Sequence, residues 1–409
     1  MNWLGVGVFV FTYVLISTRR VAWLGLDRPA GALLGAVACV LLGVLSPADA
    51  IGAINGPTLL LLFGVMGIGA FLALDGFFDT VELAIVRVAR TPVRLLGTIV
   101  WGAGVLAAFI TNDAVCVLGA PVVVRLIERH RLPPLPFLLA LATGANTGSV
   151  ATLVGNPQNM LCALLGQLSY REHLLRVAPL ALLCLAINHG MLALMFKRHI
   201  EARELEASVG NTKLDGRTWV TLAVIAATAV AYTAGADLAW AATAGFVALM
   251  LLHRRDTRLL WPRIDWSLLL FFGGLFVVVE AFVQSGAPAR LFAHFPLGEA
   301  SAGGLSGWLR IATIFLVGSN AVSNVPFILV VRAPMATLAN PTLGWELLAV
   351  ASTFAGNLTL LGSVANIIVA ESARDLGGIG FVEHLKVGLP LALLTTLVGT
   401  LWLTAVWPG

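Results

Sequence analysis

Two short stretches rich in Asn, Thr, Ser and Gly interrupt strongly apolar sequence at matching places in the two halves of the chain. Leu141–Ala163 aligns without gaps on Leu348–Ala370. The identical polar positions are Thr152 with Thr359, Gly155 with Gly362, and Asn159 with Asn366. Side chains of these types bind ions and small polar solutes, and unwound backbone between helices offers further ligands. A polar, glycine-rich interruption that recurs in both halves of an apolar chain predicts a transport site.

Two other apolar runs are also broken by polar residues at their centres. Thr111–Asp113 interrupts Leu95–Ile127, and Ser319–Asn324 interrupts Trp308–Val331. Both ends of the first run are basic, which a single membrane crossing rarely shows because Lys and Arg collect on the cytoplasmic side. We therefore predict that each run is a re-entrant hairpin. Its non-helical tip must be covered by protein or by a water-filled cavity.

Asp113 is the one acidic residue at a predicted hairpin tip, and Val325 stands at the matching position of the second tip. An acid deep in a membrane is costly unless it faces water, a cation or a proton pathway. We predict that Asp113 couples transport to protons or to a cation. The alternative is an acid that is only hydrogen-bonded to loop amides. Glu280, inside another apolar segment, is a second candidate proton carrier.

The breaks leave backbone N–H and C=O groups without helical partners, and a bare group in hydrocarbon costs several kcal/mol. Polar side chains, water, an ion or a solute must satisfy these groups. The alternative is that the polar residues only cap helix ends. The predicted substrate- and ion-binding residues are Thr111, Asn112, Asp113, Asn146, Thr152, Gly155, Asn156, Asn159, Ser323, Asn324, Asn357, Thr359, Gly362, Ser363 and Asn366.

The composition places these residues in an all-α polytopic membrane protein. Of the 409 residues, 59% are hydrophobic and only 11% are charged, whereas soluble domains carry about 25% charged residues. The four cysteines lie in apolar or site segments without metal-ligand spacing, so neither a disulfide framework nor a metal site is predicted. We find no nucleophile constellation and therefore predict no enzyme and no cofactor. The basic pI reflects loop charges that set orientation rather than nucleic-acid binding.

The order of segments predicts two inverted repeats, each with five crossings, one of them a broken helix, plus one re-entrant hairpin. An odd number of crossings forces the second repeat to run inverted. Segments predicted to be cytoplasmic carry 20 of the 25 Lys and Arg residues, which places both termini outside the cytoplasmic membrane. Residues 46–56 are predicted to form a loop. The predicted parts are repeat 1 (1–197, hairpin 95–127, broken helix 136–165), a cytoplasmic linker (198–217), and repeat 2 (218–409, hairpin 308–331, broken helix 345–371).

The motif residues resemble the ion transporter superfamily. The resemblance rests on Thr111–Asp113 with Pro121, and on Phe137–Asn159, Ser323–Pro326 and Ala355–Glu371. It is closest to ArsB-type arsenite permeases and plant silicon-efflux transporters, and more distant to NhaD-type Na⁺/H⁺ antiporters and dicarboxylate/sulfate symporters. The resemblance implies that hairpin tips and broken helices bind the coupling ion and the substrate, that this core moves like an elevator, and that the protein is a homodimer.

One departure from the superfamily pattern bears on the coupling ion. The symporters carry Ser-Asn-Thr at both tips, where they bind sodium, whereas this chain has Thr111-Asn112-Asp113 and Ser323-Asn324-Val325. The departure favours proton coupling through Asp113. The arsenite branch handles a neutral hydroxide acid, which fits tips that lack Lys and Arg.

The predicted function is a proton-coupled secondary transporter of an inorganic oxyacid or oxyanion of the arsenite or silicate type. A Na⁺-coupled symporter of anions or dicarboxylates and a Na⁺/H⁺ antiporter are the alternatives, so the coupling ion is H⁺ or Na⁺. The expected partners are a small inorganic solute, membrane lipid and a second copy of the chain, without nucleic acid.

Overall fold

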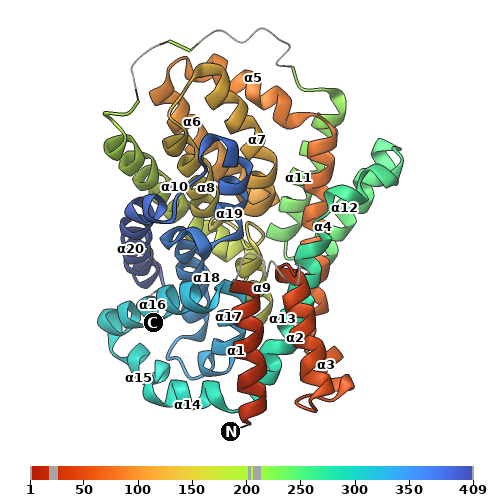
Figure 1. The fold of residues 1–409 in the computed structure, drawn as a ribbon, viewed down its shortest axis with the longest axis vertical. Helices are drawn as coiled ribbons and strands as arrows, with labels where there is room; N and C mark the ends of the chain where they lie inside the picture. The colour runs from red at the N-terminus through yellow and green to blue at the C-terminus, as the bar shows by residue number, and fades with distance from the viewer. Residues whose placement is uncertain (1, 18–25, 201–203, 206–212, 408–409) are drawn as a thin grey trace.

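The computed structural model describes residues 2–17, 26–200, 204–205 and 213–407, and the regular structure in these ranges is helical throughout (Figure 1). Six described helices are long and apolar enough to cross a membrane, by length and composition. They are α4 (Gly56–Leu74), α6 (Pro92–Ile110), α10 (Tyr170–Met195), α13 (Trp266–Gln284), α16 (Gly304–Val322) and α20 (Phe381–Val406). The chain is therefore an all-α protein of the polytopic membrane type.

The remaining elements fill each half in the same general order. In the first half they are α1 (Trp3–Ser17), α2 (Arg28–Leu41), α3 (Pro47–Ala53), α5 (Phe77–Ala89), α7 (Asn112–His130), α8 (Pro134–Ser149) and α9 (Pro157–Gly166). In the second half they are α11 (Gly216–Thr233), α12 (Leu238–His253), η1 (Thr257–Leu259), η2 (Trp261–Arg263), α14 (Ala287–His294), α15 (Leu297–Ala302), α17 (Asn324–Met335), α18 (Pro341–Leu358), η3 (Leu360–Gly362), α19 (Val364–Ser372) and η4 (Arg374–Leu376).

Each predicted hairpin contains two helices that meet at one strained residue. Thr111 joins α6 to α7 with φ of 84°, and Ser323 joins α16 to α17 with φ of 66°. Positive φ combined with the extended ψ seen here, 144° and 150°, is a region almost confined to glycine. Such strain persists only where the surroundings hold it, and it clusters at functional sites. The same strain at both tips marks them as matched structural features.

Each predicted broken helix contains two helical segments with a non-helical break between them. The first break lies between α8 and α9, and the second lies between α18 and α19 and contains η3. The side chain of Asn156 restarts the helix in the first break by accepting from the amide of Asn159 at 2.8 Å. Ser363 does the same in the second break by accepting from the amide of Ala365 at 3.2 Å. Such capping satisfies amides that the interrupted helices leave free.

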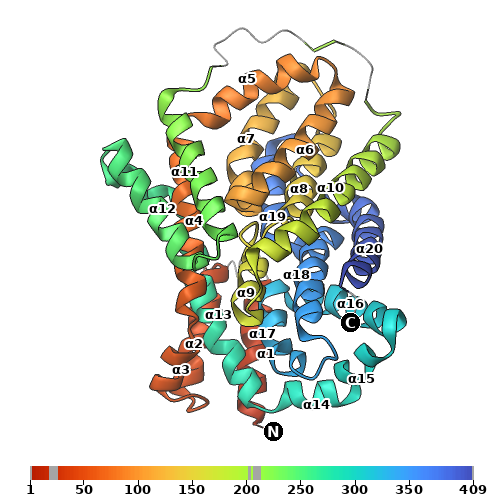
Figure 2. The same ribbon diagram turned by 180° about the vertical axis from the view of Figure 1, so that it is seen from behind.

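The two halves interlock through their hairpins and breaks. Helix α7 of the first half packs against α19 of the second, and α17 of the second half packs against α9 of the first. The pairs α1–α2 and α16–α17 lie in the lower part of the molecule, while α11–α12 and α6–α7 lie in the upper part (Figures 1 and 2). The matched elements thus occupy opposite ends, and the breaks lie between them.

Some local expectations differ from the structure. The helices of the hairpins and broken helices extend one to four residues beyond the predicted ends, and their breaks lie where the polar residues predicted them. Residues 46–56 are not a simple loop, because Ser46 caps the short helix α3 by accepting from the Asp49 amide. Part of the predicted linker, residues 201–203 and 206–212, lies outside the described residues, and α11 begins at Gly216.

Candidate functional site

A small, partly open cavity lies where the two hairpin tips and the second break meet. Its volume is about 50 Å³, and we call it the central cavity. Of the fifteen predicted site residues, six line it directly: Asn112, Asp113, Ser323, Asn324, Gly362 and Ser363. The other lining residues are Arg28, Pro157, Gln158, Leu268, Phe271, Phe272, Val325, Leu361 and Val364. Residues more than two hundred positions apart in the sequence therefore share one site.

Asn146 is the hub of the polar network behind the cavity. Its Oδ1 accepts from Asn112 Nδ2 at 2.8 Å and from Ser363 Oγ at 3.1 Å. Its Nδ2 donates to Asn357 Oδ1 at 3.2 Å and to Asn366 Oδ1 at 3.0 Å. An amide has two acceptor and two donor positions, and here all four are used by protein. Asn146 consequently holds the first tip and the second break together.

This network fixes which atom Asn112 presents to the cavity. Asn366 Nδ2 donates to two backbone carbonyls, those of Gly356 at 2.7 Å and Thr359 at 3.1 Å, so its orientation is determined. Its Oδ1 must then accept from Asn146, whose own Oδ1 must accept from Asn112. The buried Oδ1 of Asn112 is left without a hydrogen-bond partner. The buried Oδ1 of Asn324, at the second tip, also lacks a partner.

Asn159 and Asn366 perform the same structural task in the two breaks. Asn159 Nδ2 donates to the carbonyl of Thr152 at 3.0 Å, as Asn366 does to that of Thr359. Asn159 Oδ1 accepts from Thr353 Oγ1 of the other half at 2.9 Å. Because their polar groups are bonded to protein and neither lines the cavity, these matched asparagines act as clamps of the unwound backbone.

Three other predicted residues also lie behind the cavity. Thr152 Oγ1 donates to the carbonyl of Ala108 at 2.6 Å and ties the first break to α6. Thr359 Oγ1 donates to Asn320 Oδ1 at 3.3 Å, a residue of α16. Asn156 Nδ2 donates to Ser149 Oγ at 2.8 Å and to Thr353 Oγ1 at 3.0 Å. Each break is thus bonded to the hairpin of its own half or to the other broken helix.

The two matched glycines are required by close backbone approach. A Cβ on Gly155 would strike the carbonyl oxygen of Ser149, and one on Gly362 would lie 2.8 Å from the carbonyl oxygen of Ala355. Both breaks fold back on the end of the preceding helix segment, and only glycine leaves room. The Gly155 carbonyl in turn accepts from the amide of Asn112 at 2.9 Å. Gly155 therefore helps to position the first tip.

Asp113 lines the cavity and faces the start of α19, where the Ala365 amide contacts its carboxylate. The N-terminus of a helix attracts negative charge, because its first amides point outward without helical partners. Val325 holds the equivalent place at the second tip and also lines the cavity. The site accordingly contains one hairpin-tip acid and not a symmetric pair.

Arg28, at the first turn of α2, is a lining residue that the sequence did not single out. It was counted among the cytoplasmic basic residues that set orientation. The hairpin tips lack Lys and Arg, but Arg28 brings a guanidinium to the same cavity from another element. A residue of this kind has no motif around it, so only the folded arrangement reveals it.

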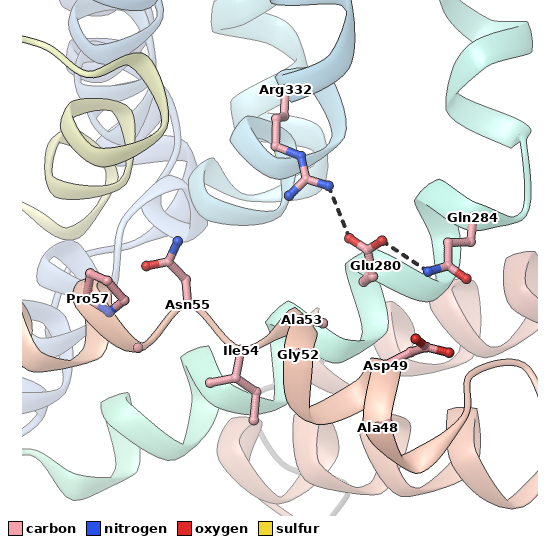
Figure 3. A pocket seen from close by; sticks show the side chains of 11 residues that line it. Ala48, Asp49, Gly52, Ala53, Ile54, Asn55, Pro57, Glu280, Gln284 and Arg332 are labelled. Carbon is pink, nitrogen blue, oxygen red and sulfur yellow. Dashed lines mark hydrogen bonds and ion pairs between the residues drawn. The ribbon is translucent and has the colours of Figure 1, made fainter.

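Glu280 lies apart from the central cavity, in a second pocket of about 510 Å³ between α3, α13 and α17. We call it the Glu280 pocket. Figure 3 shows Glu280 paired with Arg332 of α17 at 3.2 Å, while Gln284 donates to its other oxygen at 3.2 Å. Asp49 and Asn55 line the same pocket. Glu280 thus bridges α13 and the second hairpin.

The described residues contain no cluster of His, Cys, Asp and Glu of the kind that holds a metal ion. The polar residues that line the central cavity are Arg28, Asn112, Asp113, Gln158, Ser323, Asn324 and Ser363, and apolar residues such as Phe271 and Phe272 form the rest of its wall. Amide oxygens and hydroxyls suit hard cations, protonated solutes and polar hydroxyl compounds.

Comparisons with known proteins agree with this architecture. The chain is 32% identical to the silicon efflux transporter LSI3 of Oryza sativa, over 96% of this chain and 95% of that protein. A Dictyostelium discoideum protein that carries the name arsB is 24% identical over 96% of this chain and 90% of its own. The Alcanivorax borkumensis YdaH transporter has the same general fold, with a TM-score of 0.57, 15% identity, and coverage of 99% and 98% of the two chains.

The family itself follows from a direct match. The sequence profile of the CitMHS family, described as citrate transporter, matches residues 13–355, which include both hairpins and the first break. The relatives of this chain that have assigned activities are transporters and not enzymes. The chain therefore belongs to the CitMHS family of the ion transporter superfamily and is a secondary transporter of that type.

Proposed function

We propose that this protein carries a small inorganic oxyacid or oxyanion, arsenite- or silicate-like, across the cytoplasmic membrane by alternating access coupled to protons. The solute binds in the central cavity between Asn112 and Asn324, and Asp113 carries the coupling proton. Both termini lie outside, and the hairpins enter the membrane from opposite faces. The opposite placement of the matched helices in Figures 1 and 2 supports this inverted arrangement.

The observation that carries the solute class is the size of the central cavity. A cavity that holds a single water has a volume of roughly 10–15 Å³. A cavity of about 50 Å³ therefore has room for about four waters. That volume suits a central atom with three or four hydroxyl groups. Citrate, for which the family is described, is a much larger tricarboxylate and would need a wider site than this one.

The chemistry of the lining supports the same class. The two unpartnered acceptors, Asn112 Oδ1 and Asn324 Oδ1, call for hydrogen-bond donors or for a cation. A neutral hydroxide acid carries several O–H donors and can satisfy both acceptors at once. A carboxylate anion offers only acceptors to these atoms and would leave both amide oxygens unsatisfied. LSI3, named a silicon efflux transporter, is the relative whose name fits this chemistry.

One observation favours a second candidate, an anion symporter coupled to Na⁺. Arg28 brings positive charge to the cavity, and guanidinium groups suit carboxylates and oxyanions. In that case the two amide oxygens would bind sodium and Arg28 the anion. The oxyacid proposal stands ahead of it because a wider cavity would be required for a dicarboxylate.

Transport by purified protein in liposomes tests the proposal. Silicic acid, arsenite, citrate and succinate are supplied separately, with a pH gradient or a Na⁺ gradient imposed alone. We expect uptake of silicic acid or arsenite driven by the pH gradient, and none of citrate. Sodium-driven uptake of citrate or succinate without oxyacid transport would replace the first candidate by the second. Transport of none of the four solutes would overturn both assignments.

The same liposomes test the elevator and dimer expectations. Crosslinks between pairs of cysteines on α7 and α13 should trap one conformation of the cycle and stop transport, since both helices line the cavity. A single-molecule count of labelled chains per particle should give two.

A further inference from the structure

The last helix of each half begins with the same sequence signature. Tyr170-Arg-Glu-His-Leu opens α10 and Phe381-Val-Glu-His-Leu opens α20, and both helices run for 26 residues. Pro-Leu-Ala-Leu-Leu follows at the same distance in each, at Pro179 and at Pro390. His173 and His384 are therefore equivalent residues in the two halves, and both side chains are completely buried.

The surroundings of His173 make it a proton site. Its Nε2 lies 2.9 Å from the carbonyl oxygen of Val150, at the start of the first break, and must donate to it. Its Nδ1 lies 2.6 Å from Glu346 Oε2, in the first turns of α18. A contact this short between a ring nitrogen and a carboxylate oxygen requires a proton between them. That proton is shared whether the pair is written as imidazolium with carboxylate or as imidazole with carboxylic acid.

The equivalent histidine lacks this arrangement. In the register that matches the two broken helices, Val150 corresponds to Asn357 and Glu346 corresponds to Leu139. A Cβ on Gly388 would touch both the Asn357 carbonyl oxygen and the ring of His384, so the ring lies in the corresponding place. Neither ring nitrogen of His384 has a hydrogen-bond partner. The acid is thus present in one half only.

From this asymmetry we propose that His173 and Glu346 form a second proton-binding site, outside the central cavity, which exchanges one proton during the transport cycle. When the proton leaves, the Nδ1 lone pair faces a carboxylate and the pair carries one negative charge. The repulsion between Nδ1 and the carboxylate separates α10 from α18 and weakens the hydrogen bond from His173 Nε2 to the Val150 carbonyl oxygen. The loss of one proton, and the negative charge that it leaves on the pair, are thus coupled to a structural change at the first break.

Two further features fit a site that exchanges its proton. Glu346 Oε1 is buried without a partner, which leaves an open acceptor beside the shared proton. The thiol of Cys162 on α9 is another titratable group that interacts electrostatically with Glu346. On α10 itself, Glu172 pairs with Arg176 at the exposed end of the helix and does not contact the pair.

The inference rests on the proposed proton coupling, and its first test needs no solute. Infrared difference spectra between acid and base are recorded on purified wild-type protein, E346Q and H384Q. Gln is isosteric with Glu and can donate to a neutral His173, so E346Q should elute as folded protein. We expect one carboxyl band pair of wild type and H384Q to be missing from E346Q, while the bands of other carboxyl groups, such as Asp113, remain. Identical spectra for wild type and E346Q over the pH range of transport would overturn the proposal.

If E346Q does not fold, H173Q replaces it, because it removes the ring and leaves the acid in place. The pH at which the Glu346 carboxyl band appears should then change. If that pH stays the same, His173 and Glu346 do not share a proton. L139E, which supplies the missing acid beside His384, should add a second band pair.

The transport test separates this inference from the proposed function. In liposomes E346Q should move one proton fewer per solute than wild type, while H384Q should keep the wild-type ratio. An unchanged ratio in folded E346Q would overturn the second site and leave the proposed function standing. A wild-type protein that shows the band pair but transports no oxyacid would overturn the proposed solute and leave the proton site standing.

Discussion

Asn146 of the first broken helix donates to Asn366 of the second at 3.0 Å, and this bond joins the two breaks behind the central cavity. Thr353, which matches Asn146 in the second half, donates in the same way to Asn159 at 2.9 Å. The crossed pair makes the position of each break depend on the other half. The polar residues thus form two groups, clamps that are bonded within the protein and residues that line the central cavity. We expect substitutions in the two groups to have different effects.

Removal of a clamp should destabilise the fold. Asn366→Ala leaves the buried carbonyls of Gly356 and Thr359 without their donor, at roughly 1–3 kcal/mol for each unsatisfied group. The melting temperature in detergent should fall, and little folded protein should reach the membrane. A variant with wild-type melting behaviour would mean that water replaces the amide.

Removal of a cavity residue should instead abolish transport in a folded protein. In Asn112→Ala the Asn146 oxygen keeps its bond from Ser363, so the loss of stability should be on the order of 1 kcal/mol. Asn324→Ala should behave in the same way, because the side-chain Oδ1 of Asn324 also has no hydrogen-bond partner in the protein. Wild-type transport by both variants would show that these asparagines only cap helix breaks.

Asp113→Asn should weaken the coupling of transport to protons. The substitution keeps the shape of the side chain and removes the carboxylate that faces the start of α19. Solute should still bind, but its accumulation against a gradient and the pH dependence of the transport rate should fall to the level that the His173–Glu346 pair alone supports. The measurement is transport at several pH values with and without an imposed proton gradient. Full proton-driven accumulation by this variant would direct attention to His173 and Glu346.

Glu280 could act either as a proton carrier or as one half of an ion pair that links α13 to α17, and exchanging the two charges distinguishes these roles. If Glu280 acts through Arg332, the single change Glu280→Arg should slow transport several-fold, and the double change with Arg332→Glu should restore it (Figure 3). A half-exposed pair contributes only about 0–1 kcal/mol, so both variants should fold. No recovery in the double variant would favour the proton-carrier hypothesis for Glu280.

The inverted topology has a direct labelling test. Arg129 lies in the last turn of α7 and Asp237 precedes α12, and both residues are exposed. A cysteine at Arg129 should react only with a reagent supplied from the cytoplasm, and one at Asp237 only from outside. Labelling of both positions from the same side would end the inverted-repeat proposal.

The sequence predicted the breaks well because a helix in an apolar environment cannot lose its backbone hydrogen bonds without leaving polar residues as evidence. Thr111 and Ser323 join the helix pairs where the polar centres indicated. The division of labour between Asn112 and Asn159 was not predictable, because the two residue types are identical and only the contacts differ. Short helices such as α14 were missed because one or two turns leave no clear periodicity.

Arg28, His173 and Glu346 escaped notice for a different reason. None of the three lies in one of the polar breaks, and distant parts of the chain bring each of them to its site. A comparison of the two halves beyond the breaks would have found His173, since Glu-His-Leu and Pro-Leu-Ala-Leu-Leu recur in α10 and α20. Nothing local would have found Glu346, because the equivalent residue in the other half is Leu139.

The crosswise packing of α7 on α19 and of α17 on α9 also constrains how the protein is made. During synthesis the first hairpin leaves the ribosome long before α19 exists. Until then Asp113 and Asn112 lack the helix start and the asparagine network that surround them in the finished protein. The nascent first half must wait in the bilayer with an open polar tip, sheltered by water or by the insertion machinery. Separately expressed halves should accordingly be unstable alone and recover when they are produced together.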